Sequence, residues 1–171
     1  MMRLRALKLL LVVVGVTVLL LSVTSVVMAA STVPDNVVFT ESSTTLAKPI
    51  LRDGWKAKQK SGTMTYTLAG QKMFWFTSTK YWEYNGARVR NPKYWADAGL
   101  TTLATTMQWR YDGVVGSGAT YQLWNGKADG CHYNWKRGQF SQVIFGVTTA
   151  QRRPRIDFWA YGDGTATITG S

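Results

Sequence analysis

The sequence predicts an all-β fold, namely a mainly antiparallel β-sandwich or barrel of about eight or nine strands with at most one short helix. From Gly62 onward, short runs rich in Thr, Val, Tyr, Trp and Phe alternate with turns that contain Gly. Many of these turns are Asn-Gly or Asp-Gly pairs, which accept the positive φ angles of tight hairpins. Strands joined by such short links are antiparallel neighbours.

The first 29 residues have the features of a secretory signal peptide. Arg3, Arg5 and Lys8 form a positive n-region, and an almost wholly apolar run begins at Leu9. Val27-Met28-Ala29 offers small residues at a cleavage site. An uncleaved anchor is the alternative, because the apolar run approaches a membrane-spanning length. Cleavage predicts a secreted, extracellular protein without a transmembrane segment.

Removal of residues 1–29 changes the composition of the chain. They hold three of the 20 basic residues and none of the nine acidic ones, so the remaining 142 residues carry a net charge of +8. All 22 aromatic residues also remain. This length suits one domain and excludes a multidomain enzyme. Cys131 is the only cysteine, so it is either a buried apolar side chain or a link to a second chain.

Residues 30–60 read as a flexible leader that is rich in Ser and Thr and ends in a basic stretch, with one short strand over residues 37–40. Residues 61–171 then form a single β-domain. Its first hairpins are expected over residues 63–77 and 81–90. A short helix is expected over Lys93–Ala98, because Asn91 can cap it and Pro92 fits the first helical position. The pairs Asp112-Gly113, Asn125-Gly126, Asp129-Gly130, Arg137-Gly138 and Asp163-Gly164 are expected to form the later turns.

A Trp-x-Tyr pattern recurs before Asn-Gly or Asp-Gly. The pairs Trp82/Tyr84 and Trp109/Tyr111 each share one strand face, because residues i and i+2 of a strand point the same way. The simplest interpretation places these rings in the core. The functional alternative is an aromatic platform that stacks on sugar rings, with these four residues as candidate ligand-binding residues.

The charge surplus favours an anionic partner such as an envelope polymer or lipid headgroups. Two clusters of arginines are candidates for ligand binding: Arg88 and Arg90, and Arg152, Arg153 and Arg155. A solvated surface is the alternative for each cluster. The sequence carries no motif of sequence-specific nucleic-acid recognition, and it specifies no oligomeric state.

The sequence offers little for catalysis. His132 is the single histidine, and it adjoins Cys131, so the two side chains of one strand would point to opposite faces. No metal site, cofactor site or catalytic set is predicted. Glu83, between Trp82 and Tyr84, is the most interesting carboxylate for a glycosidase-type pair.

The segments Trp109-Arg110-Tyr111-Asp112-Gly113, Trp135-Lys136-Arg137-Gly138-Gln139-Phe140 and Tyr161-Gly162-Asp163-Gly164 resemble small, exported, aromatic-rich β proteins of unassigned function from actinobacteria. The resemblance covers residues 100–171 and implies export and a β fold, but no functional residue. The leading hypothesis is a secreted, non-enzymatic module that binds an anionic or glycan component of a cell envelope. The alternatives are a secreted antimicrobial or inhibitor protein and a glycan-active hydrolase.

Overall fold

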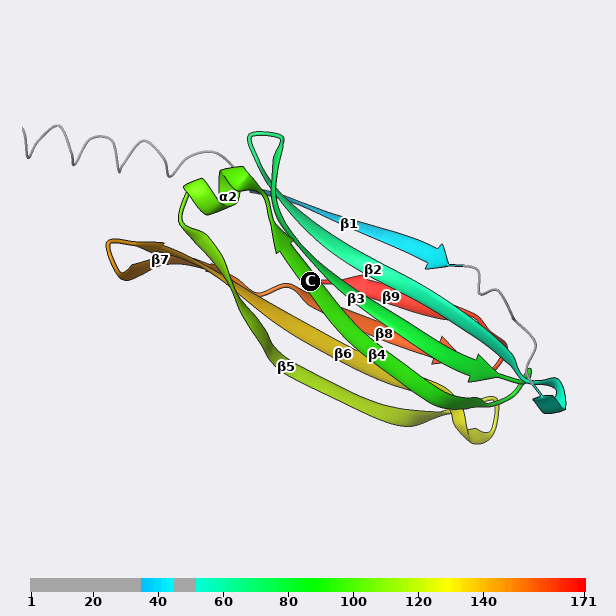
Figure 1. The fold of residues 1–171 in the computed structure, drawn as a ribbon. Coiled ribbons are helices and arrows are strands. Elements are labelled where there is room, and N and C mark those ends of the chain that lie inside the picture. Colours follow the sequence, from blue (N-terminus) through cyan, green and yellow to red (C-terminus); the bar gives the residue numbers. More distant parts are fainter. Residues whose placement is uncertain (1–34, 45–51) are drawn as a thin grey trace, which may run out of the picture. The chain divides into compact units, whose positions relative to one another are not determined.

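The computed structural model describes residues 35–44 and 52–171, so the expected signal peptide lies outside the described residues. The described residues form two antiparallel β-sheets, four-stranded sheet A and five-stranded sheet B (Figure 1). The strands are β1 (Asp35–Thr44), β2 (Lys56–Leu68), β3 (Gln71–Tyr84), β4 (Val89–Leu100), β5 (Trp109–Trp124), β6 (Lys127–Ile144), β7 (Val147–Arg152), β8 (Arg155–Tyr161) and β9 (Ala166–Gly170). A 3-10 turn η1 (Arg52–Gly54) and a short helix α2 (Thr102–Thr106) complete the described elements.

Sheet A has the strand order β1-β2-β3-β4, with each strand beside its neighbour in sequence. Sheet B has the order β5-β6-β8-β9, and β7 also pairs with β6. Strand β6 is long enough to pair with β8 over residues 131–137 and with β7 over residues 140–144. The prediction of an all-β sandwich of eight or nine strands is therefore confirmed.

The compact unit begins at Asp35, earlier than expected. The short strand expected over residues 37–40 is part of β1, which pairs with β2 along its whole length. The basic residues Lys56, Lys58 and Lys60 lie in β2. These residues of the expected leader are therefore strands of sheet A.

The helix predicted over Lys93–Ala98 is wrong, because these residues belong to β4. Their burial alternates along the strand: Ala96 and Ala98 pack against the core, whereas Trp95 is exposed. Burial of alternate side chains on one face of the strand stabilises this segment more than helix capping by Asn91 and Pro92 would. The helix occurs instead at α2, where the Thr101 hydroxyl accepts a hydrogen bond from the backbone N–H of Ala104 at 3.2 Å.

Three of the expected turns lie inside long strands. Asp129-Gly130 and Arg137-Gly138 are part of β6, and Asp112-Gly113 forms a bulge in β5, with Gly113 at a φ of 107°. Close packing explains Gly138, because a Cβ atom there would lie 2.7 Å from the ring of Phe76. The actual hairpin after β6 is the pair Phe145-Gly146.

The core between the sheets is built on aromatic rings. Phe74 of β3 stacks on Phe140 of β6, with ring centroids 4.3 Å apart and an interplanar angle of 19°. Phe76 and Phe158 are fully buried, and Trp82 meets Phe158 edge to face at 6.0 Å. Each of these buried rings contributes about 1.5–3 kcal/mol by leaving water. The core thus joins the central strands of both sheets.

One part of the core is polar. Lys80 of β3 is fully buried, and its Nζ donates a hydrogen bond of 2.5 Å to the backbone oxygen of His132. Burial lowers the pKa of Lys80 to about 7. Burial, assisted by Lys80, lowers the pKa of His132 to about 4. The side chains of Ser78 and Asn134 are also buried here, with no hydrogen-bond partner in the described part of the chain.

We expect Lys80→Met to change the pH dependence of stability. Because the folded pKa of about 7 lies below the ordinary value of 10.5, the unfolded chain binds more protons between these values, and the stability of the wild type rises with pH in this window. Relative to the variant, the free energy of unfolding of the wild type should therefore increase by up to about 1.4 kcal/mol per pH unit. Urea unfolding across this window measures the difference.

The matched control is Lys60→Met, since Lys60 is the register partner of Lys80 on β2 and is only partly buried. A difference between Lys80→Met and wild type that stays constant with pH would contradict the burial of a neutral amine at this position.

Candidate functional site

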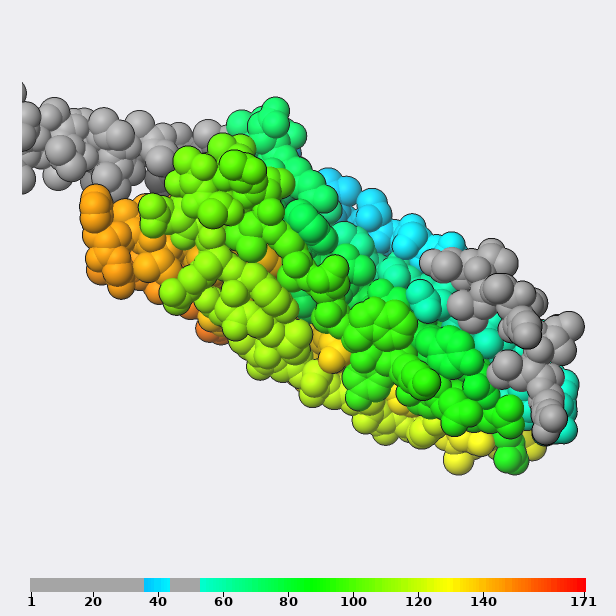
Figure 2. Space-filling model, viewed as in Figure 1, coloured from blue at the N-terminus to red at the C-terminus, as the bar shows by residue number. Residues whose placement is uncertain are grey.

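The outer face of sheet A carries a row of aromatic and polar side chains along β3 and β4. Strand register sets these outward residues opposite one another, in the pairs Trp75/Gly99, Thr77/Asp97, Thr79/Trp95, Tyr81/Lys93 and Glu83/Arg90. We call these ten residues the outer row. Figure 2 shows the side chains of β4 (green) lying along the surface beside those of β5 (yellow-green).

Trp95 is the tryptophan of the described residues whose side chain is exposed, with 43% of its surface accessible. The remaining tryptophans of the described ranges are buried or half-buried. Its cross-strand partner Thr79 is buried, whereas the Trp95 side chain is open to solvent. An exposed indole offers a flat apolar face on which a ring of a ligand can stack.

Trp75 covers a glycine of the neighbouring strand. A Cβ atom on Gly99 would lie 2.1 Å from the indole of Trp75, so only glycine leaves room for the ring. The ammonium group of Lys72 lies 4.1 Å from the ring centroid. Trp75 therefore packs β3 against β4 at one end of the outer row, and the ammonium group of Lys72 lies beside this end.

Hydroxyl groups extend the outer row onto β2. Ser61 and Thr79 share a hydrogen bond of 2.8 Å, and Thr63 and Thr77 share one of 2.9 Å. These cross-strand pairs fix the side-chain rotamers and stabilise the sheet. The surface of β2 and β3 beside Trp95 is therefore lined by hydroxyl groups that are held by hydrogen bonds.

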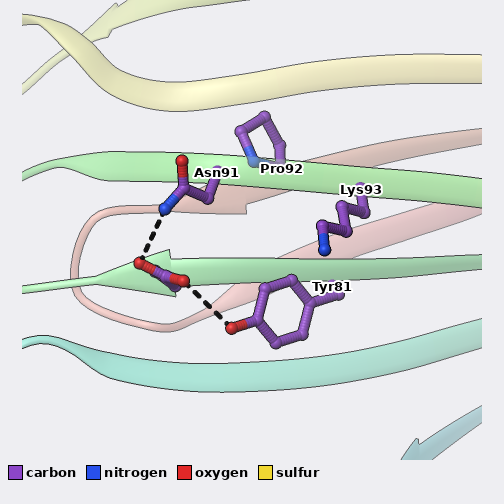
Figure 3. A pocket seen from close by; sticks show the side chains of 5 residues that line it. Tyr81, Asn91, Pro92 and Lys93 are labelled. Atoms are coloured by element: carbon purple, nitrogen blue, oxygen red, sulfur yellow. Dashed lines mark hydrogen bonds between the residues drawn. The ribbon is translucent and has the colours of Figure 1, made fainter. Parts of the chain in front are cut away.

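A shallow depression of about 460 Å³ lies at the other end of the outer row, lined by Tyr81, Glu83, Asn91, Pro92 and Lys93 (Figure 3). The Glu83 carboxylate accepts hydrogen bonds from Arg90 Nε at 2.6 Å, Asn91 Nδ2 at 3.1 Å and the Tyr81 hydroxyl at 3.1 Å. Burial alone would raise the pKa of Glu83, but these three hydrogen bonds outweigh it and hold the pKa below its ordinary value.

This geometry does not favour general-acid catalysis by Glu83. A general acid needs a raised pKa, whereas Glu83 is held ionised by Arg90. No second carboxylate lines the depression, as a glycosidase pair would require. Within the described ranges, no three His, Cys, Asp or Glu side chains come together as a metal-binding group.

The outer face of sheet B has a different character. The ring of Trp135 lies against Gly118, where a Cβ atom would be 2.5 Å from the indole nitrogen, and the Arg155 guanidinium lies 4.6 Å from the ring centroid. Arg155 donates hydrogen bonds to both carboxylate oxygens of Asp157, at 2.9 and 2.7 Å, and these bonds raise the pKa of Arg155. The Tyr133 hydroxyl completes this network with a bond of 2.5 Å to Asp157.

A second network of sheet B is centred on Asp112. Its carboxylate accepts hydrogen bonds from Ser141, from Gln139 at 3.0 Å and from Arg110 at 2.9 Å, and the bond from Ser141 is the main cause of its lowered pKa. Arg153 donates to Gln139 at 2.9 Å. Within the two networks, Arg110, Arg153 and Arg155 each donate a hydrogen bond to a side chain of the protein.

The structure places the Trp-x-Tyr residues mainly in the core. Trp82 is fully buried and presents no ring surface to a ligand. Trp109 and Tyr111 pack against the core from β5, and Tyr84 packs against it from β3. The core interpretation of this pattern is therefore confirmed.

The candidate arginines lie on both sheets and do not form one stripe. Arg90 contacts Glu83 and places its guanidinium 4.1 Å from the Trp55 ring, whereas Arg88 lies 3.5 Å from Asp129 of sheet B. Arg152 ends β7, and Arg153 and Arg155 join the networks on sheet B.

Sequence reasoning missed Trp95, Trp75, Tyr81 and Lys93. Trp95 and Lys93 were hidden by the expectation of a helix, although Tyr94, Ala96 and Ala98 alternate with Lys93, Trp95 and Asp97 in the sequence. Period-two alternation is therefore the signal that could have found them.

Cys131 and His132 do not form a catalytic pair. Cys131 is buried, with 2% of its surface exposed, and is a free thiol. Burial raises its pKa, which makes the thiolate scarce. As neighbours in β6 the two side chains point to opposite faces of the sheet.

Comparison of the chain with protein-family models, curated proteins and solved structures gave no match. Among the described residues, no helix has the length and apolar character that spanning a bilayer requires.

We expect Glu83→Gln to lower stability at neutral pH. The amide keeps the shape of the side chain but loses the charge that binds Arg90, at a cost of about 1–3 kcal/mol. Because the pKa of Glu83 is lowered, its contribution is present above the ordinary carboxyl pKa and disappears as pH falls through the folded value. Thermal unfolding at neutral and acidic pH should show a penalty that shrinks on acidification, and an equal penalty at both would contradict it.

We expect Gly99→Ala to displace the ring of Trp75. The new methyl group would overlap the indole, and such overpacking costs about 1–3 kcal/mol. Tryptophan fluorescence and near-ultraviolet circular dichroism report the movement of the ring. The control is Ala98→Gly on the same strand, which adds no atoms. An unchanged spectrum for Gly99→Ala would contradict the close contact.

Proposed function

We propose that this protein is a secreted, non-enzymatic module that binds an anionic glycan of a cell envelope through the outer row of sheet A. The observation that carries the proposal is the exposed ring of Trp95 above a rigid, hydroxyl-lined strand surface. Secretion is the expectation from residues 1–29, and it would place the module where such glycans occur.

The chemistry of the outer row suits a sugar polymer. The apolar face of a pyranose ring can stack on the Trp95 indole, as flat apolar ligands do on aromatic side chains. Neighbouring Asp97 and Lys93 are both exposed and can form hydrogen bonds with sugar hydroxyls. An extended strand surface presents these groups in a line, which matches an extended polymer better than a compact metabolite.

The exposed lysines in the outer row (Lys93) and beside it (Lys72) favour an anionic glycan over a neutral one. Lys72 lies over Trp75, Lys93 stands opposite Tyr81, and both are exposed. Of the two carboxylates in the row, Glu83 is neutralised by Arg90, so Asp97 alone remains as an opposing charge. The net charge of +8 that remains after removal of residues 1–29 acts in the same direction at long range.

A binding role is favoured over hydrolysis because Glu83, the strongest carboxylate candidate, is ionised and fully hydrogen-bonded. Its lowered pKa opposes proton donation to a leaving group.

We expect Trp95→Ala to weaken binding to an anionic polysaccharide about tenfold or more, because the stacking surface is lost. Titration calorimetry or affinity electrophoresis with polygalacturonate and hyaluronate, and with dextran as a neutral polymer, measures the change. Lys93→Gln should reduce the salt dependence of binding and leave stacking intact.

The matched control is Phe145→Ala, which removes an exposed aromatic ring from the β6–β7 hairpin outside the outer row. Equal losses in Trp95→Ala and Phe145→Ala, or no binding of the wild type to any of the three polymers, would overturn the proposal.

A further inference from the structure

The hairpin between β6 and β7 exposes an apolar tip. Phe145 is fully exposed, Val147 is 64% exposed and Ile144 is 36% exposed. Only Phe145 and Gly146 link the two strands, so the ring stands at the outermost point of the hairpin. We call these three apolar residues the hairpin tip.

The backbone gives no reason for phenylalanine at this position. Phe145 and Gly146 have φ angles of 50° and 80°, the positive pair typical of a two-residue hairpin that favours Asn-Gly. The β5–β6 hairpin has the same geometry, with φ angles of 47° and 73°, and it does use Asn125-Gly126. A bulky residue at positive φ costs stability, and Phe145 gains no burial in return.

The chain segments that include α2 and the hairpin tip contain no charged residue. Strand β6 contacts the region after α2 through the Val143 N–H, which donates to the Gln108 oxygen at 3.0 Å. On α2, Leu103 adds an exposed apolar side chain at the same end of the domain (Figure 1). Residues 100–109 and 142–151 contain no charged residue; their polar residues are Thr and Gln.

Basic residues flank these two uncharged segments. Arg110 follows the first segment, and Arg152 and Arg153 follow the second. Arg110 has 63% of its side chain exposed. From the hairpin tip inward, the order is therefore an apolar tip, a Thr/Gln belt and then arginines.

We propose that the hairpin tip inserts into the interfacial region of an anionic lipid bilayer. The order of side chains matches the order of the bilayer surface, with acyl chains for Phe145, Ile144 and Val147, polar headgroups for Thr and Gln, and lipid phosphates for arginine. Aromatic rings favour the membrane interface, and each basic residue near an anionic surface adds attraction.

A lipid surface fits the hairpin tip better than a second copy of the chain. Stable protein interfaces bury about 1,200–2,000 Å² in total, more than a few side chains of a narrow hairpin provide. Two copies would also bring like charges together, since each chain carries +11. A bilayer accepts a small apolar tip and attracts the cations behind it.

The test uses the full chain and a local reporter, so that the signal reports insertion of the hairpin tip itself. Phe145→Trp places an indole at the tip, and Asn125→Trp places one in the geometrically matched β5–β6 hairpin. With vesicles of phosphatidylglycerol and phosphatidylcholine, the added indole at position 145 should shift to the blue and be quenched by brominated lipids. The added indole at position 125 should show neither effect, and vesicles of phosphatidylcholine alone should give a weaker response.

A second variant separates binding from folding. Phe145→Asn installs the preferred turn residue, so the fold should be as stable as the wild type or more so. Its affinity for anionic vesicles, measured as displacement of the Phe145→Trp protein, should fall about ten- to hundredfold. Equal responses at positions 125 and 145, or no response at 145, would overturn the proposal.

Sedimentation experiments without lipid test the alternative partner. If the wild type self-associates and Phe145→Asn does not, the tip binds a second copy of the chain, and the proposal is overturned. The inference is independent of glycan binding, because Trp95→Ala should leave the lipid response unchanged.

Discussion

The stacking of Phe74 on Phe140 joins the two sheets of a domain that cannot form an intrachain disulfide. These rings come from β3 and β6, which lie inside sheets A and B, so the contact fixes which face of each central strand points inward. Because side chains alternate along a strand, the same contact turns the other face of β3 outward with Trp75, Thr77 and Tyr81. The outer row of sheet A is thus a consequence of the core. A shift of the strand register by one residue would turn the core side chains outward and the outer row inward.

Phenylalanines fill the core, and two of the tryptophans cover the outer faces. Trp75 lies on Gly99 of edge strand β4, and Trp135 lies on Gly116 and Gly118 of edge strand β5. In each case a cation, Lys72 or Arg155, lies near the ring. The two indoles thus shield glycines that would weaken an edge strand. One face of each indole is therefore used in packing within the protein. Trp95 has no glycine opposite it, since its register partner is Thr79, and its ring is exposed.

Alternation and turn chemistry predicted the class of the fold and the burial of Trp82, Trp109 and Tyr111. They failed where two signals competed. Asn91-Pro92 resembles a helix start, but the alternate burial of Ala96 and Ala98 gains more than a short exposed helix could. Asp129-Gly130 and Arg137-Gly138 resemble turns, but these glycines lie within β6; Gly138, for one, makes room for Phe76. Pairing across strands decides which rings are covered, and a single sequence does not contain the register. Alternation could therefore have placed Trp95 and Lys93 on one face of a strand, but it could not have placed them opposite Thr79 and Tyr81.

Lys80 and Phe145 each lower the stability of the domain, Lys80 because its amino group is buried and Phe145 because its φ angle is positive. The two differ in whether contacts within the domain compensate for this cost. The buried amino group of Lys80 has partners inside the domain, because it donates a hydrogen bond to the backbone oxygen of His132 and lies 5.3 Å from the Phe158 ring. Phe145, at positive φ in the β6–β7 hairpin, gains no compensating contact among the described residues, because its ring is fully exposed. Unfavourable local choices that the fold does not compensate are concentrated at functional positions in natural proteins. We therefore assign the contact that accounts for Phe145 to a partner of the protein, and an uncharged belt backed by arginines favours an apolar surface with negative charge behind it.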